Sequence, residues 1–362
     1  MVKTLFTHFD INGVSLNNRL AVAPMTRVSA NEDGTPNNTM NRYYERFARG
    51  GFGLIITEGL YTDQAYAQGY AYQPGMSDDE QAQAWKPLVD TLHAQGSKVF
   101  AQLMHAGALT QGNRFRNDTL APSALQPKGE QMTLYRGQGP YPLPKAMTEA
   151  DIADVISSFA QAAKRAVEIA GFDGIEIHGA NGYLLDQFFT DYTNTRDDRW
   201  GGNTRQRLSL SLEVYKAVRS AVGANVPVGI RISQGKVNDF EHKWKEGEAG
   251  AEIVFGTLAE AGIDFIHVTE HEAWQPAFGE GSSLAALARR YAPNVTVIAN
   301  GKLHDPERAA QALEDGADLI AIGRGALANP DWPQKVENAQ VLAEFDPSLL
   351  GPIAHIKESE TL

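Results

Sequence analysis

The sequence predicts an α/β protein whose eight parallel β-strands close into a (β/α)8 TIM barrel, with a long capping loop after strand 3. Eight short apolar runs recur along the chain, and each is followed by a segment with helical start and stop signals. The runs are continuously apolar rather than alternating, as expected of parallel strands that are covered on both faces. Eight such units favour a closed barrel, although an open, doubly wound sheet fits the same alternation.

The predicted strands are rich in aliphatic side chains. In chain order they cover residues 20–23, 54–57, 99–103, 174–178, 228–232, 265–269, 295–299 and 319–323. No internal linker rich in Gly, Pro or Ser separates one group of strands from another. We therefore expect residues 1–362 to form a single domain.

The predicted helices lie between these strands. They cover residues 38–49, 77–95, 148–170, 204–222, 247–261, 283–291 and 305–315. The second helix opens with Ser77-Asp-Asp-Glu and the third with Thr148-Glu-Ala-Asp, and both spacings are typical of a capping box. The two helices end at Gly96 and Gly171, as expected of a glycine C-cap.

One connection breaks this regular alternation. The segment from Met104 to Lys145 has no helical pattern and is rich in Gly, Pro and polar residues. Loops of this length are commonly functional covers, so we expect this one to cap a site. The chain after Trp332 is irregular, and its last six residues are expected to fray.

The composition excludes several functions. The formal charge of -12, from 44 acidic and 32 basic residues, disfavours nucleic acid and anionic membranes as partners. Because the chain has 0 cysteines, it has no disulfide, thiolate nucleophile or iron–sulfur cluster. The N-terminus lacks the apolar run of a signal peptide, and no apolar stretch is long enough to span a membrane. A cytoplasmic location is therefore expected.

Glycines follow the last two predicted strands. Strand seven ends in Asn300-Gly301, and strand eight ends in Gly323-Arg324. Glycines at such positions let backbone N–H groups approach an anion, and an arginine can neutralise it. The loops after strands seven and eight are a frequent phosphate site of this fold. The alternative is that the glycines only make tight turns.

Gln102 and Arg231 end strands three and five. An amide that both donates and accepts suits the edge of a planar heterocycle with carbonyl and N–H groups. An arginine beside such a ring would stabilise its anionic form. Each residue alone is weak evidence, because an arginine in a barrel mouth is as often paired with an acidic residue.

The densest group of polar side chains follows strand four, in His178-Gly-Ala-Asn181-Gly-Tyr183. His178 and Asn181 could each donate a hydrogen bond to one carbonyl oxygen as negative charge builds on it. Tyr183 could then protonate a carbon beside that carbonyl. The alternative is a buried structural histidine with structural Asn and Tyr neighbours.

The sequence lacks residues that other classes of barrel enzyme require. A metal-dependent hydrolase would need several His and Asp ligands at strand ends, and a Schiff-base aldolase would need a lysine there, so we expect no metal site. A glycosidase would need two carboxylates, for which Glu58 and Glu270 remain candidates. A phosphosugar isomerase and a flavin or steroid binder without turnover also remain open.

The ordered motifs of this chain resemble the Old Yellow Enzyme family of FMN-containing NAD(P)H oxidoreductases over nearly its whole length. The matching pieces are Asn18-Arg19-Leu20, Ala23-Pro24-Met25-Thr26-Arg27, Gln68-Gly69-Tyr70, Gln102-Leu103-Met104-His105-Ala106-Gly107, His178-Gly-Ala-Asn-Gly-Tyr-Leu-Leu-Asp-Gln-Phe188, Thr193-Asn194-Thr195-Arg196 and Gly323-Arg324. Asn181 and Thr26 are typical of the yeast and enterobacterial members. Met104 and Ala108 depart from that subgroup, in the region of the substrate pocket.

The resemblance implies a role for each residue at the strand ends. Pro24, Met25 and Gly59 would line the flavin, Thr26 would bond to the carbonyl beside N5, Gln102 would read the pyrimidine edge and Arg231 would face N1. The FMN phosphate would be held by Asn300, Gly301, Gly323 and Arg324. His178 and Asn181 would bind the substrate oxygen, and Tyr183 would supply the proton. Tyr70, and more weakly Tyr135, Trp274 and Phe278, would line the entrance.

The chemistry implied by the resemblance is a ping-pong cycle. NADPH or NADH passes a hydride to FMN, and an α,β-unsaturated carbonyl or a nitroalkene then receives it at the β-carbon. Nitro esters and quinones are further substrate classes of such enzymes. The physiological substrate, the choice between NADPH and NADH, and a monomeric or homodimeric state stay open.

Overall fold

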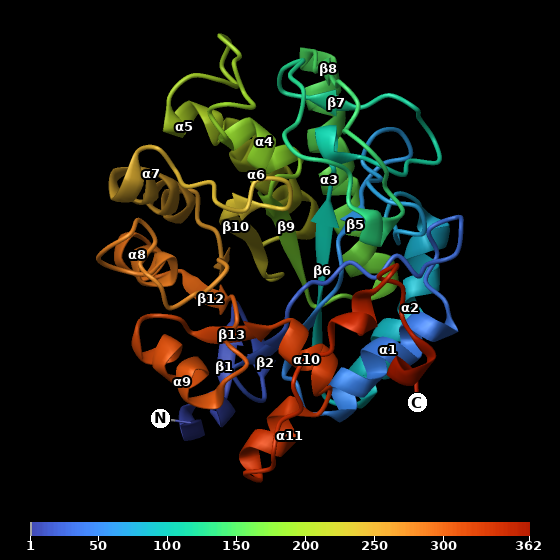
Figure 1. Cartoon of the computed structure of the whole chain (residues 1–362), viewed down its shortest axis with the longest axis vertical. Helices are drawn as coiled ribbons and strands as arrows, with labels where there is room; N and C mark the ends of the chain where they lie inside the picture. The colour runs from blue at the N-terminus through green and yellow to red at the C-terminus, as the bar shows by residue number, and fades with distance from the viewer. Residues whose placement is uncertain (1) are drawn as a thin grey trace.

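The computed structural model describes residues 2–362, and its centre is a closed barrel of eight parallel strands (Figure 1). These strands are β3 (Leu20–Val22), β4 (Leu54–Ile56), β6 (Lys98–Met104), β9 (Gly174–Asn181), β10 (Val228–Lys236), β11 (Phe265–Thr269), β12 (Thr296–Asn300) and β13 (Leu319–Ile322). The ring closes because β13 pairs with β3 and β4 pairs with β6. The predicted barrel and its eight strands are confirmed.

Two strands run several residues further than predicted. β9 and β10 continue past residues 178 and 232, and Asn181 pairs with Lys236 after a bulge in the register. A bulge bends a strand and redirects its side chains. The extension therefore shapes the segment that carries the densest group of polar residues.

A small hairpin fills one end of the barrel. Its strands are β1 (Phe9–Ile11) and β2 (Val14–Leu16), and they pair antiparallel. The turn residues Asn12 and Gly13 both have positive φ, 46° and 82°, as a two-residue hairpin turn requires. Ile11 and Leu16 pack with apolar side chains of the barrel interior, such as Phe100. A site can therefore form only at the opposite end, where the strands terminate.

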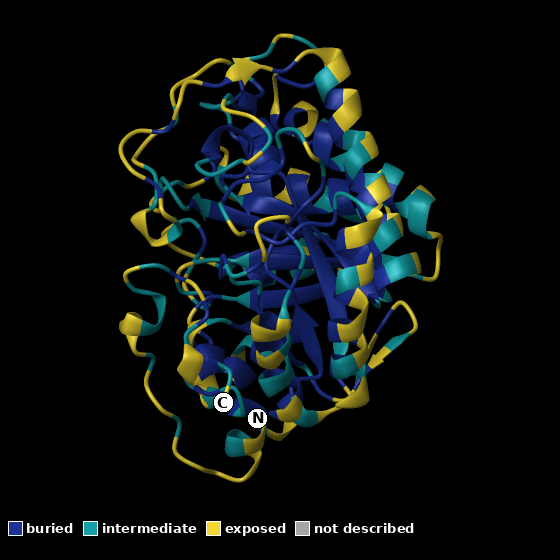
Figure 2. Ribbon diagram, turned by 90° about the vertical axis from the view of Figure 1, so that its right-hand side faces the viewer, coloured by how far each residue is buried: buried dark blue, intermediate teal, exposed yellow. Residues whose placement is uncertain are grey.

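Helices surround the barrel, with buried faces toward the strands and exposed faces outward (Figure 2). The main ones are α1 (Asn38–Arg49), α2 (Asp79–Ala94), α3 (Glu149–Arg165), α6 (Ser209–Val222), α7 (Gly247–Glu260), α8 (Leu284–Tyr291) and α9 (Pro306–Glu314). A π-helical turn, Ala166–Ala170, extends α3, and α5 (Thr204–Arg207) precedes α6. All seven predicted helices are present. None of the helices in the described part of the chain is both long and apolar enough to cross a membrane.

The helix starts differ in part from prediction. Thr148 forms the predicted capping box with Asp151. The N-cap of α2 is Asp78 rather than Ser77, because the Asp78 carboxylate accepts from the backbone N of Gln81 at 2.8 Å. Three short helices were not predicted: α4 (Leu184–Phe189), α10 (Arg324–Ala328) and α11 (Trp332–Glu337). α4 follows directly from the polar segment after β9.

The long connection after β6 covers the open end of the barrel. It contains two short paired strands, β7 (Leu120–Ala121) and β8 (Lys145–Ala146), which lie together at the top of Figure 1. Leu109, Met132, Tyr135 and Tyr141 from this connection pack against Tyr70 and Tyr183. The predicted capping loop is therefore present.

The predicted frayed C-terminus is wrong. Glu360 is 1% exposed, and its carboxylate binds the Arg27 guanidinium through two contacts of 2.7 and 2.5 Å. Arg27 Nε also donates to the carbonyl of Ala354 at 3.0 Å, and Arg46 adds a contact of 3.1 Å to Glu360. The tail is ordered because it supplies the counter-ion of a buried arginine, which its own sequence does not reveal.

Replacing Glu360 by Ala is expected to lower the free energy of unfolding by about 3–5 kcal/mol, because Arg27 would stay buried without its carboxylate. The measurement is thermal and denaturant unfolding of the variant. Glu358→Ala, at an exposed position two residues away, is the matched control and should stay close to wild type. Equal stability of Glu360→Ala and wild type would mean that the tail does fray.

Candidate active site

Polar side chains form a layer inside the barrel, toward the carboxyl ends of the strands. We call Gln102, Glu176, His267 and Arg231 the polar layer. Gln102 on β6 donates its Nε2 to Glu176 Oε1 at 2.8 Å, and Glu176 Oε2 lies 2.7 Å from His267 Nδ1. Glu176 and His267 are completely buried. Neither residue was predicted as part of the site from the sequence. The two-residue period of a strand could have found them, since Glu176 lies two positions before His178 and shares its face.

Arg231 lies in the same layer and is held by Asn300. Its Nη2 donates to Asn300 Oδ1 at 2.8 Å, and that oxygen also accepts from Thr269 at 2.7 Å. The Asn300 amide nitrogen donates to the carbonyl of Ala321 at 2.9 Å. The side chain of Asn300 therefore holds Arg231, and its predicted contact with the phosphate is corrected in this respect. Arg231 Nε is buried and has no hydrogen-bond partner among residues 2–362.

His178 is a neutral hydrogen-bond donor. Burial lowers its pKa well below the ordinary value, and the positive charge of Arg231 acts in the same direction. Its Nδ1 accepts from the backbone N of Ala180 at 3.4 Å, so the single ring proton belongs on Nε2. A neutral imidazole with a protonated Nε2 can donate to a ligand oxygen.

Asn181 occupies a constrained turn. It has a φ of 60°, which is rare for a residue other than Gly, and Gly182 follows with a φ of 87°. The turn is held from β10, because the backbone N of Asn181 donates to Ser233 Oγ at 2.8 Å and Val237 N donates to the Asn181 carbonyl at 3.0 Å. Such strain persists only where surrounding contacts enforce it.

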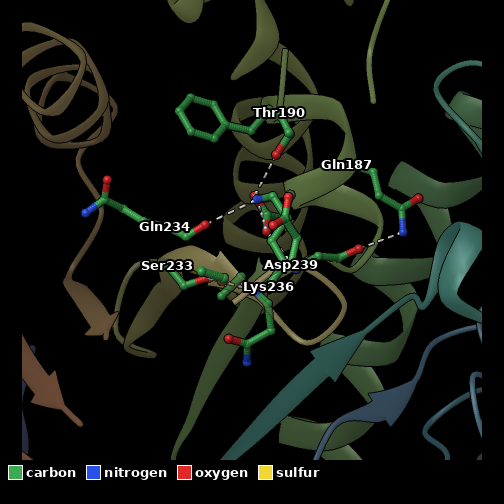
Figure 3. A network of polar contacts seen from close by, with 12 residues as sticks. Gln187, Thr190, Ser233, Gln234, Lys236 and Asp239 are labelled. Atoms are coloured by element: carbon green, nitrogen blue, oxygen red, sulfur yellow. Dashed lines mark hydrogen bonds and ion pairs between the residues drawn. The ribbon is translucent and has the colours of Figure 1, made fainter. Parts of the chain in front are cut away.

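A buried ion pair supports the same turn from behind. Asp186 Oδ2 accepts from the backbone N of Gly182 at 2.7 Å and lies 2.9 Å from Lys236 Nζ. Figure 3 shows Lys236 within this network, close to Gln234 and Thr190. The contacts fix the backbone between Asn181 and Tyr183 and so keep both side chains at the mouth of the barrel.

Tyr183 belongs to a group of four tyrosines, Tyr70, Tyr135, Tyr141 and Tyr183, which we call the tyrosine cluster. The hydroxyls of Tyr70 and Tyr183 form a hydrogen bond, and the rings of Tyr183 and His178 lie 5.0 Å apart. Burial raises the pKa of Tyr183, while the hydrogen bond from Tyr70 lowers it. Tyr183 therefore holds its proton at neutral pH, and Tyr70 can stabilise the phenolate that remains after the proton leaves.

The other predicted entrance aromatics are placed differently. Trp274 lies beneath Arg308, whose guanidinium carbon is 3.7 Å from the ring centroid, and Phe278 packs near Trp244. Both pack against the outer hydrophobic core rather than the tyrosine cluster. Of the four predicted entrance aromatics, the structure thus brings Tyr70 and Tyr135 next to Tyr183.

The residues expected along the flavin lie at the ends of β3 and β4. Pro24, Met25 and Thr26 are partly exposed, in contrast to the buried strand before them. Gly59 is buried, and a Cβ there would lie 2.5 Å from Met104 Sδ. The two strand ends therefore present a surface on which a planar ligand could lie.

The glycines after β12 and β13 make close backbone approaches. Gly301 has a φ of 141°, and a Cβ on it would lie 2.2 Å from the carbonyl oxygen of Glu270. Gly323 precedes α10, whose first residue, Arg324, is exposed. The N–H groups in the first turn of a helix have no partner within the helix. An anion could approach here, next to the Arg324 side chain.

The glycosidase alternative is wrong. Glu58 is completely buried, where it accepts from the backbone N of Arg27 at 3.0 Å and from Tyr44 at 3.3 Å. Glu270 is paired with Lys243 at 2.7 Å. Neither carboxylate is offered to a ligand.

The buried carboxyl of Glu58 is expected to make the stability of the protein depend on pH. Burial raises its pKa from 4.5 to about 7, so the folded protein keeps a proton that the unfolded chain releases. The resulting stability is complete below pH 4.5 and is lost as the pH rises through about 7. Glu58→Gln cannot titrate, so its melting temperature should rise relative to wild type between about pH 5 and about pH 8. A constant difference would contradict the buried, protonated carboxyl; the exposed Glu344→Gln is the control.

The fold and this site define a (β/α)8-barrel enzyme with one polar centre at the carboxyl ends of its strands. Residues 4–342 match the model of the NADH:flavin oxidoreductase / NADH oxidase family. Chanoclavine-I aldehyde reductase of Penicillium roqueforti is 36% identical over 352 residues, which cover 94% of this chain and 91% of the relative. 12-oxophytodienoate reductase 1 of Oryza sativa is 36% identical over 351 residues, covering 95% and 88%.

Solved structures agree with these relatives. An Old Yellow Enzyme homologue from Zymomonas mobilis has a TM-score of 0.87 and 30% identity, covering 99% of this chain and 98% of that one. Morphinone reductase in complex with tetrahydroNAD has a TM-score of 0.83 and 32% identity, covering 96% and 93%. This chain belongs to the NADH:flavin oxidoreductase / NADH oxidase family and is an oxidoreductase that depends on a flavin and a nicotinamide nucleotide. The resemblance to Old Yellow Enzyme is confirmed.

The residues at the barrel mouth fit FMN. Arg231 Nε and His267 Nε2 are buried polar atoms without a hydrogen-bond partner in the described part of the chain, as expected where a polar ligand completes the network. Gln102 uses one N–H on Glu176 and retains a donor and an acceptor for a heterocycle. The glycine turns after β12 and β13 suit the phosphate.

Proposed function

We propose that this protein is an ene-reductase that uses NADPH or NADH to reduce the C=C bond of α,β-unsaturated carbonyl compounds and nitroalkenes in a ping-pong cycle. The supporting observation is that His178 and Asn181 on β9, with Tyr183 directly after it, lie next to β10, where Arg231 is opposite His178. FMN, when bound, would accept a hydride from the nicotinamide and return it to the substrate. The proposal extends to nitro esters and quinones.

The FMN would be held by residues from six strand ends. Pro24, Met25 and Gly59 would contact the ring, Thr26 would donate to the carbonyl beside N5, Gln102 would bind the pyrimidine edge, Arg231 would face N1, and Gly301, Gly323 and Arg324 would bind the phosphate. Asn300 would act by holding the Arg231 guanidinium, to which it is hydrogen-bonded at 2.8 Å. The whole chain, residues 1–362, would act as one FMN-binding domain, either as a monomer or as a homodimer.

His178 and Asn181 would bind the activating oxygen of the substrate. The neutral imidazole donates from Nε2, and the Asn181 amide donates from the constrained turn. The His178 ring and the Asn181 backbone are held before substrate arrives, so the two donors would stabilise charge on that oxygen with little reorganisation. This polarises the alkene and directs the hydride to its β-carbon.

Tyr183 would protonate the α-carbon. Its phenol is neutral, buried and hydrogen-bonded to Tyr70, which supports the phenolate left behind. The tyrosine cluster packs with apolar side chains such as Met104 and Leu109. We therefore expect substrates that are small and largely apolar, with one strong acceptor oxygen.

The test is turnover by the purified, FMN-loaded protein under anaerobic conditions. NADPH or NADH is supplied with 2-cyclohexenone or 1-nitrocyclohexene, and the products are identified by gas chromatography. Saturated ketone and nitroalkane, formed only with nicotinamide present, are the expected products. Flavin reduction without conversion of any activated alkene would refute the proposed substrate class.

A further inference from the structure

Glu176 is a carboxylate enclosed in the barrel interior. It lies between Ile175 and Ile177, which pack in the outer hydrophobic core, so its own side chain faces inward with that of His178. Its exposed fraction is 0%. A buried carboxylate is strongly unfavourable unless hydrogen bonds and opposite charge compensate it. The proposed chemistry does not use Glu176. Its role is therefore inferred from the groups that offset the cost of burying its carboxylate.

Two donors bind the two oxygens of Glu176. Gln102 Nε2 lies 2.8 Å from Oε1, and His267 Nδ1 lies 2.7 Å from Oε2. Burial lowers the pKa of His267, which favours a neutral ring. With its proton on Nδ1, that ring donates to one oxygen of the Glu176 carboxylate while Gln102 Nε2 donates to the other.

The carboxylate determines which way the Gln102 amide points. An ionised carboxylate accepts hydrogen bonds and cannot donate them, so Gln102 has to present its NH2 group to Glu176. One amide N–H and the amide oxygen then remain for the ligand side. An uncharged partner such as a glutamine could bond to either end of the amide and would not impose this orientation.

Glu176 also lies close to the positive charge of Arg231. Arg231 is opposite His178 on β9 and opposite His267 on β11, so the strand that carries it runs between the strands of Glu176 and His267. Burial lowers the pKa of Arg231, and the carboxylate of Glu176 counteracts this. Asn300, which holds the guanidinium, is uncharged. Glu176 thus reduces the positive potential that Arg231 creates in this layer.

We propose that Glu176 is a positioning residue of the flavin site, which fixes the Gln102 amide and offsets the charge of Arg231, and thereby lowers the reduction potential of bound FMN. This inference rests on the proposed function. A negative charge close to bound FMN would disfavour the electrons that reduction adds. It therefore slows the acceptance of hydride from NAD(P)H and speeds its donation to the alkene.

The experiment compares wild type with Glu176→Gln as FMN-loaded proteins. The midpoint potential is measured by anaerobic reduction against a reference dye, and both half-reactions are followed by stopped flow. The variant should have a more positive potential, faster flavin reduction by NADPH and slower reoxidation by 2-cyclohexenone, each rate changing about fivefold. Opposite changes in the two rates separate this role from structural damage, which would slow both.

Two further variants complete the test. Glu176→Asp keeps the charge and should keep a potential close to wild type, even if FMN binds more weakly. Glu270→Gln makes the same chemical change next to β11, where the carboxylate is paired with Lys243, and should leave the potential unchanged. An unchanged potential in Glu176→Gln, or equal slowing of both half-reactions, would overturn the proposal.

A measurement on the wild type covers the case in which Glu176→Gln does not fold. Nitrogen-15 NMR of histidine-labelled protein should show His267 as a neutral ring protonated at Nδ1, and a charged imidazolium would contradict the arrangement. If the wild type binds FMN but does not reduce 2-cyclohexenone, the proposed substrate is refuted while the potentials still test Glu176.

Discussion

Tyr183→Phe is expected to slow reoxidation of the reduced flavin by 2-cyclohexenone about 10²–10⁴-fold, the usual contribution of a positioned general acid. Flavin reduction by NADPH needs no proton at the α-carbon, so it should stay close to wild type. The reason is that the phenol is protonated, buried and next to His178, with a ring separation of 5.0 Å. Anaerobic stopped flow at the flavin absorbance measures the two steps separately.

Two other members of the tyrosine cluster act as comparisons. Tyr141 is 1% exposed and its hydroxyl has no partner among residues 2–362, so Tyr141→Phe removes a buried hydroxyl that makes no hydrogen bond to Tyr183. It should leave both half-reactions unchanged. Tyr70→Phe removes the hydrogen bond to the Tyr183 hydroxyl and should give a smaller loss in reoxidation than Tyr183→Phe. Equal slowing of both half-reactions by Tyr183→Phe would exclude the proton-donor role.

His178→Ala is expected to lower kcat/KM for 2-cyclohexenone by about 10²–10³-fold, as for the loss of one oxyanion-binding donor. The structure supports this size of effect because the ring is fixed by Ala180 and its donor is ready before substrate binds. Steady-state rates over a range of enone concentrations measure the change. His271→Ala, an exposed histidine after β11, is the control and should behave like wild type.

The pH dependence gives an independent check on His178. Because burial holds its pKa well below 6.5, the ring stays neutral as the pH falls from about 8 to about 6. The reoxidation rate of the wild type should therefore show no histidine titration in this range. A rate that changes with an apparent pKa near 6.5, and loses that change in His178→Ala, would mean that His178 acts as the imidazolium.

Much of the barrel could be predicted because continuous apolar runs and helix signals act locally. Residues 54–57 and 319–322 are short apolar runs of this kind, and helical segments on both sides favour buried strands there. His178, Arg231 and Gln102 were predicted at strand ends because this fold places its site there, whereas the structure places all three within β9, β10 and β6. Local patterns were therefore sufficient for the strands and helices, but not for the contacts among the polar residues.

Contacts between distant segments could not be predicted in the same way. Arg27 and Glu360 are 333 positions apart, and nothing in either segment indicates the other. The amide of Asn300 was expected at the phosphate, but its partners are Arg231 and Thr269 on neighbouring strands. Such pairs depend on the register of the closed barrel, which the sequence pattern alone does not specify.

The interior polar layer was missed for a related reason. Glu176 and His267 lie inside apolar runs, where a single polar residue resembles an interruption rather than part of a site. Their partnership appears only when β9 and β11 are placed on either side of β10. The left-handed turn at Asn181 likewise depends on the extension of β10 to Lys236.

The most direct test of the central claim is the visible absorbance spectrum of the purified protein, recorded anaerobically before and after NADPH and then 2-cyclohexenone. We predict a flavin band that NADPH bleaches and the enone restores, which would establish the cofactor and both half-reactions together. A colourless protein that FMN cannot reconstitute would contradict the account.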